Sequence, residues 1–247
     1  MRQPRLAGVI ERRLLVNYRI DPAAAARLLP QPLRPHLVHG HAVGGICLLR
    51  LGHLRPTWAP SAFGLRSENA AHRIAVEWDG PGGVHTGVYI PRRDSASRLN
   101  AWAGGRVFPG AHGRADFDVH ETPGRIHVVL ATHDGGTRAA VTAEPDDELY
   151  GSHLFADLAE ASRFFRSRAT GFSPGSDGRL EGIELRTGTW HMEPCRIRAA
   201  RSSYFDDPDR FPPGTAILDS ALIMRNLPVH RQPLAATDTG HRTPPAG

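Results

Sequence analysis

The segment 64–112 concentrates the side chains of this sequence that could do chemistry on a small molecule. The planar guanidinium of arginine suits bidentate binding of a carboxylate or phosphate. Arginines recur here at the ends of expected strands: Arg73, Arg92, Arg93 and Arg106. We therefore expect a cluster that orients an organic anion. The alternative is a salt-bridged surface turn around Arg92, Arg93 and Asp94, because surface ion pairs are common.

Groups that could move protons occur in the same segment. His72 adjoins Arg73 and is close in sequence to Glu77, so a carboxylate could set its pKa, although a structural, hydrogen-bonded histidine is the alternative. Tyr89 and Trp102 flank the arginines and either line a pocket or simply pack in the core. The predicted proton-transfer residues are His72, Glu77, Tyr89 and His112. The predicted substrate-binding residues are Asn69, Arg73, Arg92, Arg93, Arg106 and Trp102.

Several chemistries are excluded or left without support. All 30 residues counted as lysine or arginine are arginine, so no lysine can form an imine, bind a phosphate as in a P-loop or act as an amine base. Motifs of serine hydrolases and nucleotide sites are missing. His36, His39 and His41 come closest to metal-ligand spacing, but no further cluster matches them, and surface histidines are the preferred interpretation. We expect no metal and no cofactor.

Composition indicates a soluble globular protein. The chain has 247 residues, 40% hydrophobic and 22% charged, and no apolar run approaches the roughly 20 residues of a membrane span. The N-terminus does not read as a signal peptide, and Cys47 and Cys195 fit a reducing cytoplasm. The arginines behind the net charge of +5 are scattered among acids, so nucleic acid is not an expected partner. The expected partner is a small-molecule carboxylate or carbonyl ligand, and a homo-oligomer is left open.

Short apolar or alternating runs, separated by glycine and proline, indicate strands of a sandwich or barrel. They span residues 9–20, 42–54, 73–78, 84–90, 114–120, 125–132, 138–143, 181–190, 196–205 and 216–224. The segments 114–120 and 125–130 flank a Thr-Pro-Gly turn and predict a hairpin. We expect an α+β protein, mainly β with a few helices.

Two helices are predicted. Asp21 and Pro22 supply an N-cap and a proline at the first helical position, and Pro30 ends this helix. In the second, over 151–168, apolar residues recur on one side, acids lie toward the start and arginines toward the end, as in a core-packing helix. We predict one domain over residues 1–232 and a disordered tail over 233–247.

Several motifs follow one another in a specific order. They are VNYRIDP (16–22), LLP (28–30), GLRSENAAHR (64–73), GVYIPRRD (87–94), AGGRVFPG (103–110), SRFF (162–165), LEGIEL (180–185) and DSALIM (219–224). Over roughly residues 9–228 this set resembles the YqjF-like family of uncharacterised proteins, which is similar in fold to acetoacetate decarboxylase. The resemblance implies an antiparallel β-barrel that encloses a ligand cavity, with a flanking helical piece. It does not imply the reaction.

The chain departs from the decarboxylase pattern where the catalytic amine would stand. Relatives of acetoacetate decarboxylase carry a Gly-Tyr-Pro-Lys-Lys type of segment whose lysine is activated by its surroundings. The nearest equivalent here is residues 105–112, with glycine, alanine and histidine in place of the lysines. An imine to substrate cannot form there.

The resulting hypothesis is a small-molecule enzyme of acetoacetate decarboxylase-like fold that lacks the Schiff-base lysine. It would act by non-covalent acid/base chemistry, of lyase, hydratase or isomerase type, on a carboxylated or carbonyl-bearing metabolite. The alternatives are a non-catalytic binding protein that uses the same arginine-lined cavity, and a structural subunit whose cavity is filled by side chains. An enzyme predicts an open cavity in which a histidine or carboxylate of displaced pKa faces the arginines, and a binding protein predicts an arginine-lined cavity without such a group. A structural subunit predicts no cavity large enough for a ligand.

Overall fold

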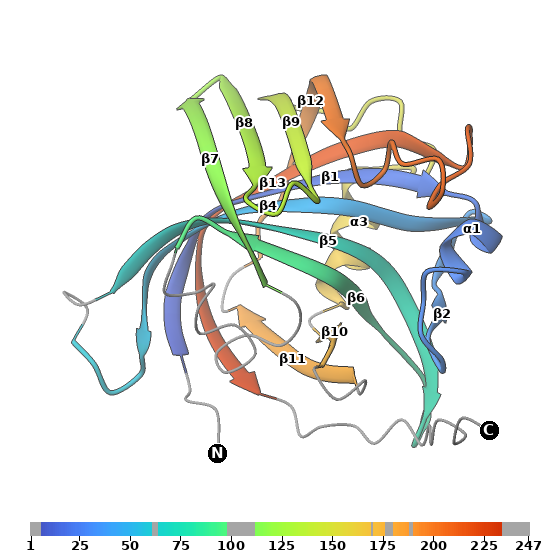
Figure 1. Cartoon of the computed structure of the whole chain (residues 1–247), viewed down its shortest axis with the longest axis horizontal. Coiled ribbons are helices and arrows are strands. Elements are labelled where there is room, and N and C mark those ends of the chain that lie inside the picture. Colours follow the sequence, from blue (N-terminus) through green and yellow to red (C-terminus); the bar gives the residue numbers. More distant parts are fainter. Residues whose placement is uncertain are drawn as a thin grey trace.

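The computed structural model describes residues 6–60, 64–97, 112–168, 170–175, 180–187 and 190–233. Within them the chain is mainly strand, with helices α1 (Pro22–Ala26) and α3 (Leu158–Arg166) (Figure 1). The α+β class is confirmed, and every predicted run overlaps a strand. The strands are β1 (Leu6–Ile20), β2 (Arg34–Pro35), β3 (Leu37–Val38), β4 (His41–Pro56), β5 (Leu65–Gly80), β6 (Gly83–Ser95), β7 (His112–Thr122), β8 (Arg125–Thr132), β9 (Arg138–Pro145), β10 (Thr170–Pro174), β11 (Leu180–Thr187), β12 (Glu193–Ser202) and β13 (Ala216–Pro233).

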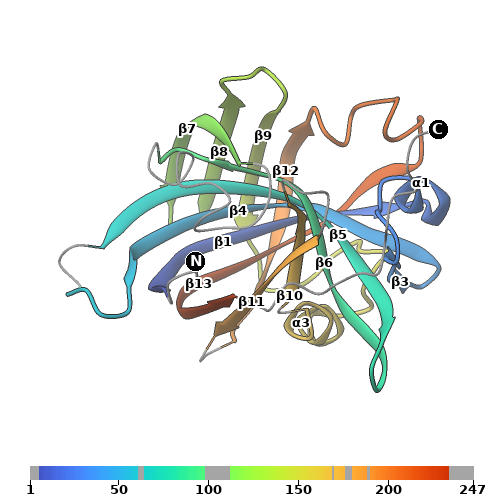
Figure 2. The same ribbon diagram turned by 60° about the horizontal axis from the view of Figure 1, so that its bottom comes forward.

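The strands form one sheet whose pairings close on themselves twice. The order is β11-β10-β6-β7-β8-β9-β12-β13-β1-β4-β5-β2, with additional pairings of β6 with β5 and of β11 with β13. A larger ring thus runs through β7, β8, β9 and β12, a smaller ring runs through β10 and β11, and β6, β5, β4, β1 and β13 belong to both. Figures 1 and 2 show the two sets of closing strands on opposite sides of the shared strands, with α3 beside β10 and β11.

Most pairings are antiparallel, as the predicted hairpin is. In that hairpin Thr122 of β7 lies opposite Arg125 of β8. Two pairings are parallel, namely β6 with β7 and β10 with β6. These two parallel pairings are the points at which each ring leaves β6.

The shared strands are buried on both faces. On β1, Leu14 and Val16 belong to the apolar cluster that fills the larger ring, whereas Leu15 belongs to a second cluster that includes residues of α3. Successive side chains of a strand point to opposite faces, and burial of both faces explains the nearly continuous apolar runs. One step along a shared strand therefore moves a side chain from one ring to the other.

Helix α3 is shorter than predicted, and the predicted start at residue 151 is wrong. The segment before it is held by side chains instead, because Ser152 Oγ donates to Asp219 Oδ2 (2.6 Å) and the His153 amide donates to Asp219 Oδ1 (2.8 Å). The helix begins after Asp157, whose Oδ1 accepts from the Glu160 amide at 2.7 Å. Phe164 and Phe165, on the predicted apolar side, are buried.

Helix α1 begins where the sequence predicts and ends sooner. Asp21 is its N-cap, with Oδ1 accepting from the Ala24 amide at 2.9 Å, but the helix stops at Ala26 and turns follow before Pro30. Neither helix of the described ranges is long and apolar enough to cross a membrane. Of the predicted tail only Pro233, the last residue of β13, is described.

Candidate functional site

Polar side chains gather on the smaller-ring face of the shared strands. Leu15 (β1), Cys47 (β4), Ala71 (β5) and Arg93 (β6) lie opposite one another in a row across four strands. Directly paired residues of antiparallel strands project to the same face. The rows on either side bring five more polar residues to the same face: Arg13, Asn17, Asn69, Arg73 and Ser95. Together with Cys47 and Arg93, we call these residues the basic face.

The sequence suggested that Arg73 lies at a strand end, but it lies in the middle of β5. Its side chain is 3% exposed, and its guanidinium stands 4.8 Å from the centre of the Phe165 ring of α3. Its Nη2 donates to Asn17 Oδ1 at 2.5 Å, while its Nε is buried without a hydrogen-bond partner among the described residues. Burial, together with the nearby Arg13 and Arg168, lowers the pKa of Arg73 to about 10 against an opposing effect of Cys47.

Gly45 allows this placement. It lies opposite Arg73, and a Cβ there would stand 2.4 Å from the carbonyl oxygen of Val16 and 3.3 Å from Arg73 Nη2. Any side chain at this position would collide with the neighbouring strand. The bare backbone of Gly45 lets the guanidinium lie over β4 and reach Asn17 on β1.

Arg93 and Asn69 complete the predicted binding residues that the structure brings together. Arg93 Nη2 donates to Ser173 Oγ of β10 at 3.3 Å, and burial lowers the pKa of Arg93 to about 10. Glu181 of β11 lies directly opposite Ser173, and its Oε2 is buried with no hydrogen-bond partner among the described residues. The side-chain oxygen of Asn69 accepts from Ser95 Oγ at 2.7 Å.

His72 lies on the opposite face from Arg73. It is fully buried in the larger ring, with its ring 4.5 Å from that of Tyr204 and its Nε2 3.4 Å from Ser202 Oγ. Burial, helped by Arg92 and Arg210, lowers the pKa of His72 to about 3. The imidazole is therefore neutral at ordinary pH and points into the larger ring, away from the basic face.

Tyr89 and Arg92 also belong to the larger-ring face. Tyr89 packs in that ring's apolar cluster, and burial raises its pKa. Arg92 Nε donates to Asp94 Oδ1 at 2.8 Å, and its Nη2 contacts both carboxylate oxygens of Asp134. Burial opposes the charge of Arg92, but these hydrogen bonds raise its pKa overall. The salt-bridge interpretation thus applies to Arg92 and Asp94, while Arg93 belongs to the basic face.

Glu77 lies near the end of β5 and is engaged by other groups. Its Oε1 accepts from Arg34 Nε at 2.8 Å, and its Oε2 lies 3.0 Å from His36 Nδ1. His112 begins β7, paired with Arg93 of β6. The described part of the chain contains no group of three His, Cys, Asp or Glu side chains arranged to hold a metal ion. Two predicted residues, Trp102 and Arg106, lie outside the described residues.

A comparison with models of protein families identifies the family of this chain. The family model for DUF2071, described as an uncharacterized conserved protein, matches residues 9–219. The chain belongs to the DUF2071 family. This confirms the resemblance noted from the ordered motifs, and a comparison with curated protein sequences finds no match.

Solved structures show which fold this family member has. An acetoacetate decarboxylase from Legionella pneumophila is 13% identical, with a TM-score of 0.57 over 94% of this chain and 87% of that one. An acetoacetate decarboxylase-like enzyme from Sphingomonas wittichii RW1 is 15% identical, with a TM-score of 0.59 over 94% and 93%. The enduracididine biosynthesis enzyme MppR, complexed with pyruvate, is 13% identical, with a TM-score of 0.56 over 96% and 92%. The fold is acetoacetate decarboxylase-like.

A second charged cluster of this DUF2071 protein escaped the sequence analysis. On the larger-ring face, Arg12 contacts Glu68 (2.6 Å) and Glu121 (3.1 Å), and Glu121 also contacts Arg50 (3.0 Å) and Arg225 (2.5 Å). We call these five residues the ion network. Its members come from β1, β4, β5, β7 and β13, so only the strand register brings them together. No alternation around these positions separates Arg12 from Arg13 in the sequence, because both faces of β1 are buried.

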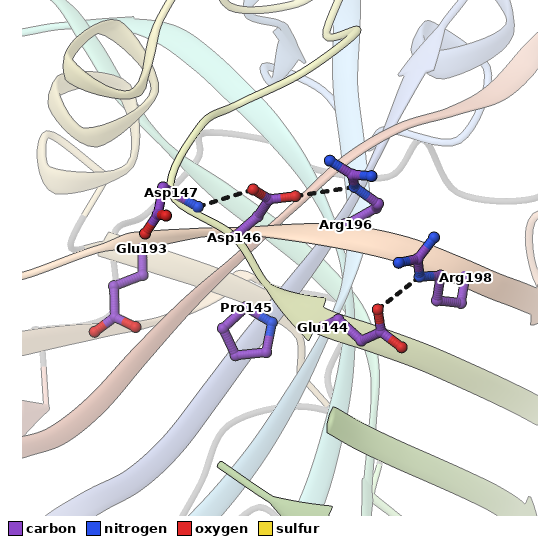
Figure 3. A pocket seen from close by; sticks show the side chains of 7 residues that line it. All are labelled: Glu144, Pro145, Asp146, Asp147, Glu193, Arg196 and Arg198. Carbon is purple, nitrogen blue, oxygen red and sulfur yellow. Dashed lines mark hydrogen bonds and ion pairs between the residues drawn. The ribbon is translucent and has the colours of Figure 1, made fainter. Parts of the chain in front are cut away.

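The family member also carries a surface pocket of about 390 Å³ over β9 and β12 (Figure 3). Its charged side chains largely satisfy one another, since Asp146 accepts from Arg196 Nε (2.9 Å) and Glu144 accepts from Arg198 Nε (2.7 Å). None of the predicted site residues lines it. The basic face is therefore the better candidate for a functional site.

Proposed function

We propose that this protein is a small-molecule enzyme that binds a carboxylated, carbonyl-bearing metabolite against the basic face and acts on it without an imine. The acetoacetate decarboxylase-like fold supports this proposal, as does the similarity to MppR, an enzyme whose solved structure is a complex with pyruvate. The sequence has no lysine to form an imine, and the chemistry that we propose is proton transfer beside a bound anion, as in lyases, hydratases and isomerases.

The observation that carries the proposal is the buried guanidinium of Arg73, which contacts no carboxylate of the described residues. A charge taken out of water is costly unless it is paired with an opposite charge. Among the described residues Arg73 has a neutral amide, Asn17, as its hydrogen-bond partner and no carboxylate. Arg13 and Arg168 add further positive charge nearby. An organic anion bound at this face would supply the missing negative charge.

A non-catalytic binding protein remains the second candidate, and one observation favours it. His72 and Tyr89, two of the predicted proton-transfer residues, project into the larger ring and away from the basic face. If no other group on this face can exchange a proton with a ligand, the same arginines would only capture it.

Ligand binding tests the proposal directly. Native mass spectrometry of the freshly purified protein would reveal a co-purified anion, and thermal unfolding with a panel of 2-oxo and hydroxy acids would rank ligands. We expect stabilisation by at least one carboxylate. The Arg73→Ala variant should lose that stabilisation and stay folded, whereas Arg92→Ala, whose partners are Asp94 and Asp134, should keep it. Loss of binding in Arg92→Ala with retention in Arg73→Ala would contradict the proposal.

A further inference from the structure

We propose that Cys47 is the proton-transfer group of the basic face, exchanging a proton between its thiol and the carbon next to the carbonyl of the bound ligand. This inference rests on the proposed function and names the residue that performs its chemistry. Nothing in the sequence motifs singled out Cys47, which stands in an apolar stretch of β4.

The register places Cys47 of β4 on the same face as Arg73 of β5 and Arg93 of β6. It shares a row with Arg93, separated from it by Ala71, and the adjacent row carries Arg73. Its side chain is 4% exposed and forms no disulfide. The electrostatic interaction with Cys47 raises the pKa of both Arg73 and Arg93 against the effect of burial, so the sulfur lies close enough to both guanidiniums to act on their charge.

A second observation points to a ligand beside this sulfur. Arg73 is nine-tenths or more buried, and its Nε has no hydrogen-bond partner among the described residues. Three of the four predicted proton-transfer groups are turned elsewhere or engaged: His72 and Tyr89 lie in the larger ring, and Glu77 is held by Arg34 and His36. The fourth, His112, begins β7 beside Arg93. Glu181 is a further acid that the register of the described strands brings to this side, opposite Ser173.

The step conserves atoms and electrons. The carboxylate of a 2-oxo acid pairs with the guanidiniums, and the Cys47 thiolate removes a proton from the carbon next to the ketone. The C–H bond breaks, an S–H bond forms, and the C–H electron pair becomes a carbon–carbon double bond while the carbonyl oxygen takes the negative charge. A guanidinium stabilises this enolate. Return of the proton regenerates the thiolate, and no oxidant or reductant is consumed.

Hydrogen exchange in D₂O measures this step. Pyruvate is the probe, and proton NMR follows the loss of its methyl signal with wild type, Cys47→Ser and Cys195→Ser. We expect exchange with wild type and with Cys195→Ser, and a decrease of about 100-fold or more with Cys47→Ser, the usual range for loss of a general base. Exchange that persists in Cys47→Ser and disappears in Glu181→Gln would overturn the proposal and assign the role to Glu181.

Alkylation of the wild-type protein tests the same residue without a variant. Iodoacetate carries a carboxylate and iodoacetamide does not, so the basic face should make iodoacetate the faster reagent at Cys47. Cys195 is the internal control, because burial raises the pKa of its thiol to about 12. Peptide mass spectrometry should find Cys47 modified first by iodoacetate. Modification of Cys195 first, or no preference for iodoacetate, would overturn the proposal.

Binding separates this inference from the proposed function. If pyruvate stabilises wild type and Cys47→Ser equally and neither exchanges protons, the role of Cys47 is refuted and the binding site stands. If no 2-oxo acid binds and iodoacetate shows no preference for Cys47, both are refuted. Exchange lost in Cys47→Ser while pyruvate still stabilises that variant supports both.

Discussion

Two buried arginines on opposite faces of the same strands have opposite electrostatic surroundings. Arg12 is 1% exposed and contacts two carboxylates, Glu68 and Glu121, whereas Arg73 is 3% exposed and hydrogen bonds to the neutral Asn17. Burial alone therefore does not distinguish a structural arginine from one that binds a ligand. The presence or absence of a counter-charge does, because a buried ion without one is the costly case.

The ion network and the basic face differ also in how they are assembled. Glu121 of β7 contacts Arg12, Arg50 and Arg225, so the network ties a strand of the larger ring to the shared strands β1, β4 and β13. On the basic face, among the described residues, Arg73 hydrogen bonds to the amide of Asn17, and Arg93 hydrogen bonds to the hydroxyl of Ser173. We infer that the network stabilises the fold and that the basic face holds charge for binding.

The sharpest test of this comparison exchanges each arginine for methionine. Arg12→Met leaves Glu68 and Glu121 without their central partner, and we expect it to cost about 4 kcal/mol of unfolding free energy. Arg73→Met removes a buried charge that has no carboxylate partner in the described part of the chain, and the free protein should stay within about 1 kcal/mol of wild type. Urea denaturation at low salt measures both. Equal destabilisation by the two substitutions would end the distinction.

Glu121→Gln should be the next largest change. It removes the carboxylate shared by three arginines, and we expect a loss of about 3 kcal/mol. Glu144→Gln is the matched control, because Glu144 forms an outer ion pair with the half-exposed Arg198 and should lose less than about 1 kcal/mol. The same urea titrations apply, and added salt should reduce the control's small effect more than that of Glu121→Gln.

The neutral His72, on the network's side of the strands, predicts an acid-side loss of stability. Its folded pKa of about 3 lies below the unfolded value of 6.5, so the unfolded state takes up the proton first. The contribution of His72 is complete above about pH 6.5 and decreases as the pH falls toward 3. Between pH 7 and 5 this amounts to about 2 kcal/mol at most.

Unfolding titrations at pH 7 and 5 measure that loss. The His72→Gln variant should lose less stability on acidification than wild type. His191→Gln, a change at a histidine whose side chain is 81% exposed, should behave as wild type. An unchanged slope in His72→Gln would show that His72 is not kept neutral by burial.

The smallest expected effect concerns the helix that covers the basic face. Asp157 caps α3 by accepting from the Glu160 amide, and Glu160 Oε2 accepts from the Ala156 amide at 2.7 Å in return. Asp157→Ala should cost about 1 kcal/mol, and Asp157→Asn should restore most of it. Because Phe165 of α3 stacks on Arg73, the alanine variant should also bind ligand more weakly. Thermal unfolding with and without pyruvate checks both effects.

The sequence predicted the strands well because alternation and turn residues are local signals. The hairpin of β7 and β8 and the N-cap Asp21 follow from such signals and are confirmed. The assignment of side chains to faces was less complete because β5 begins at Leu65, eight residues before the expected strand. With both residues inside one strand, the neighbours His72 and Arg73 must point to opposite faces.

The ion network and the position of Cys47 depend on register across several strands. Arg12 meets Arg50 and Arg225 only because β1 pairs with β4 on one side and with β13 on the other. No local pattern in one sequence carries that information. The single domain over 1–232 and the cytoplasmic location stay predictions, and a homo-oligomer stays open. Both cysteines, Cys47 and Cys195, are free.

The five strands that belong to both rings form a partition between two compartments of the molecule. Deleting one residue from the middle of β5 would move the guanidinium of Arg73 into the apolar compartment of the larger ring and bring the imidazole of His72 to the compartment of the smaller ring. A substitution in a shared strand affects only the compartment into which that side chain points, but the number of residues in the strand is fixed by both compartments. Insertions and deletions should therefore accumulate in the connections, never within these strands.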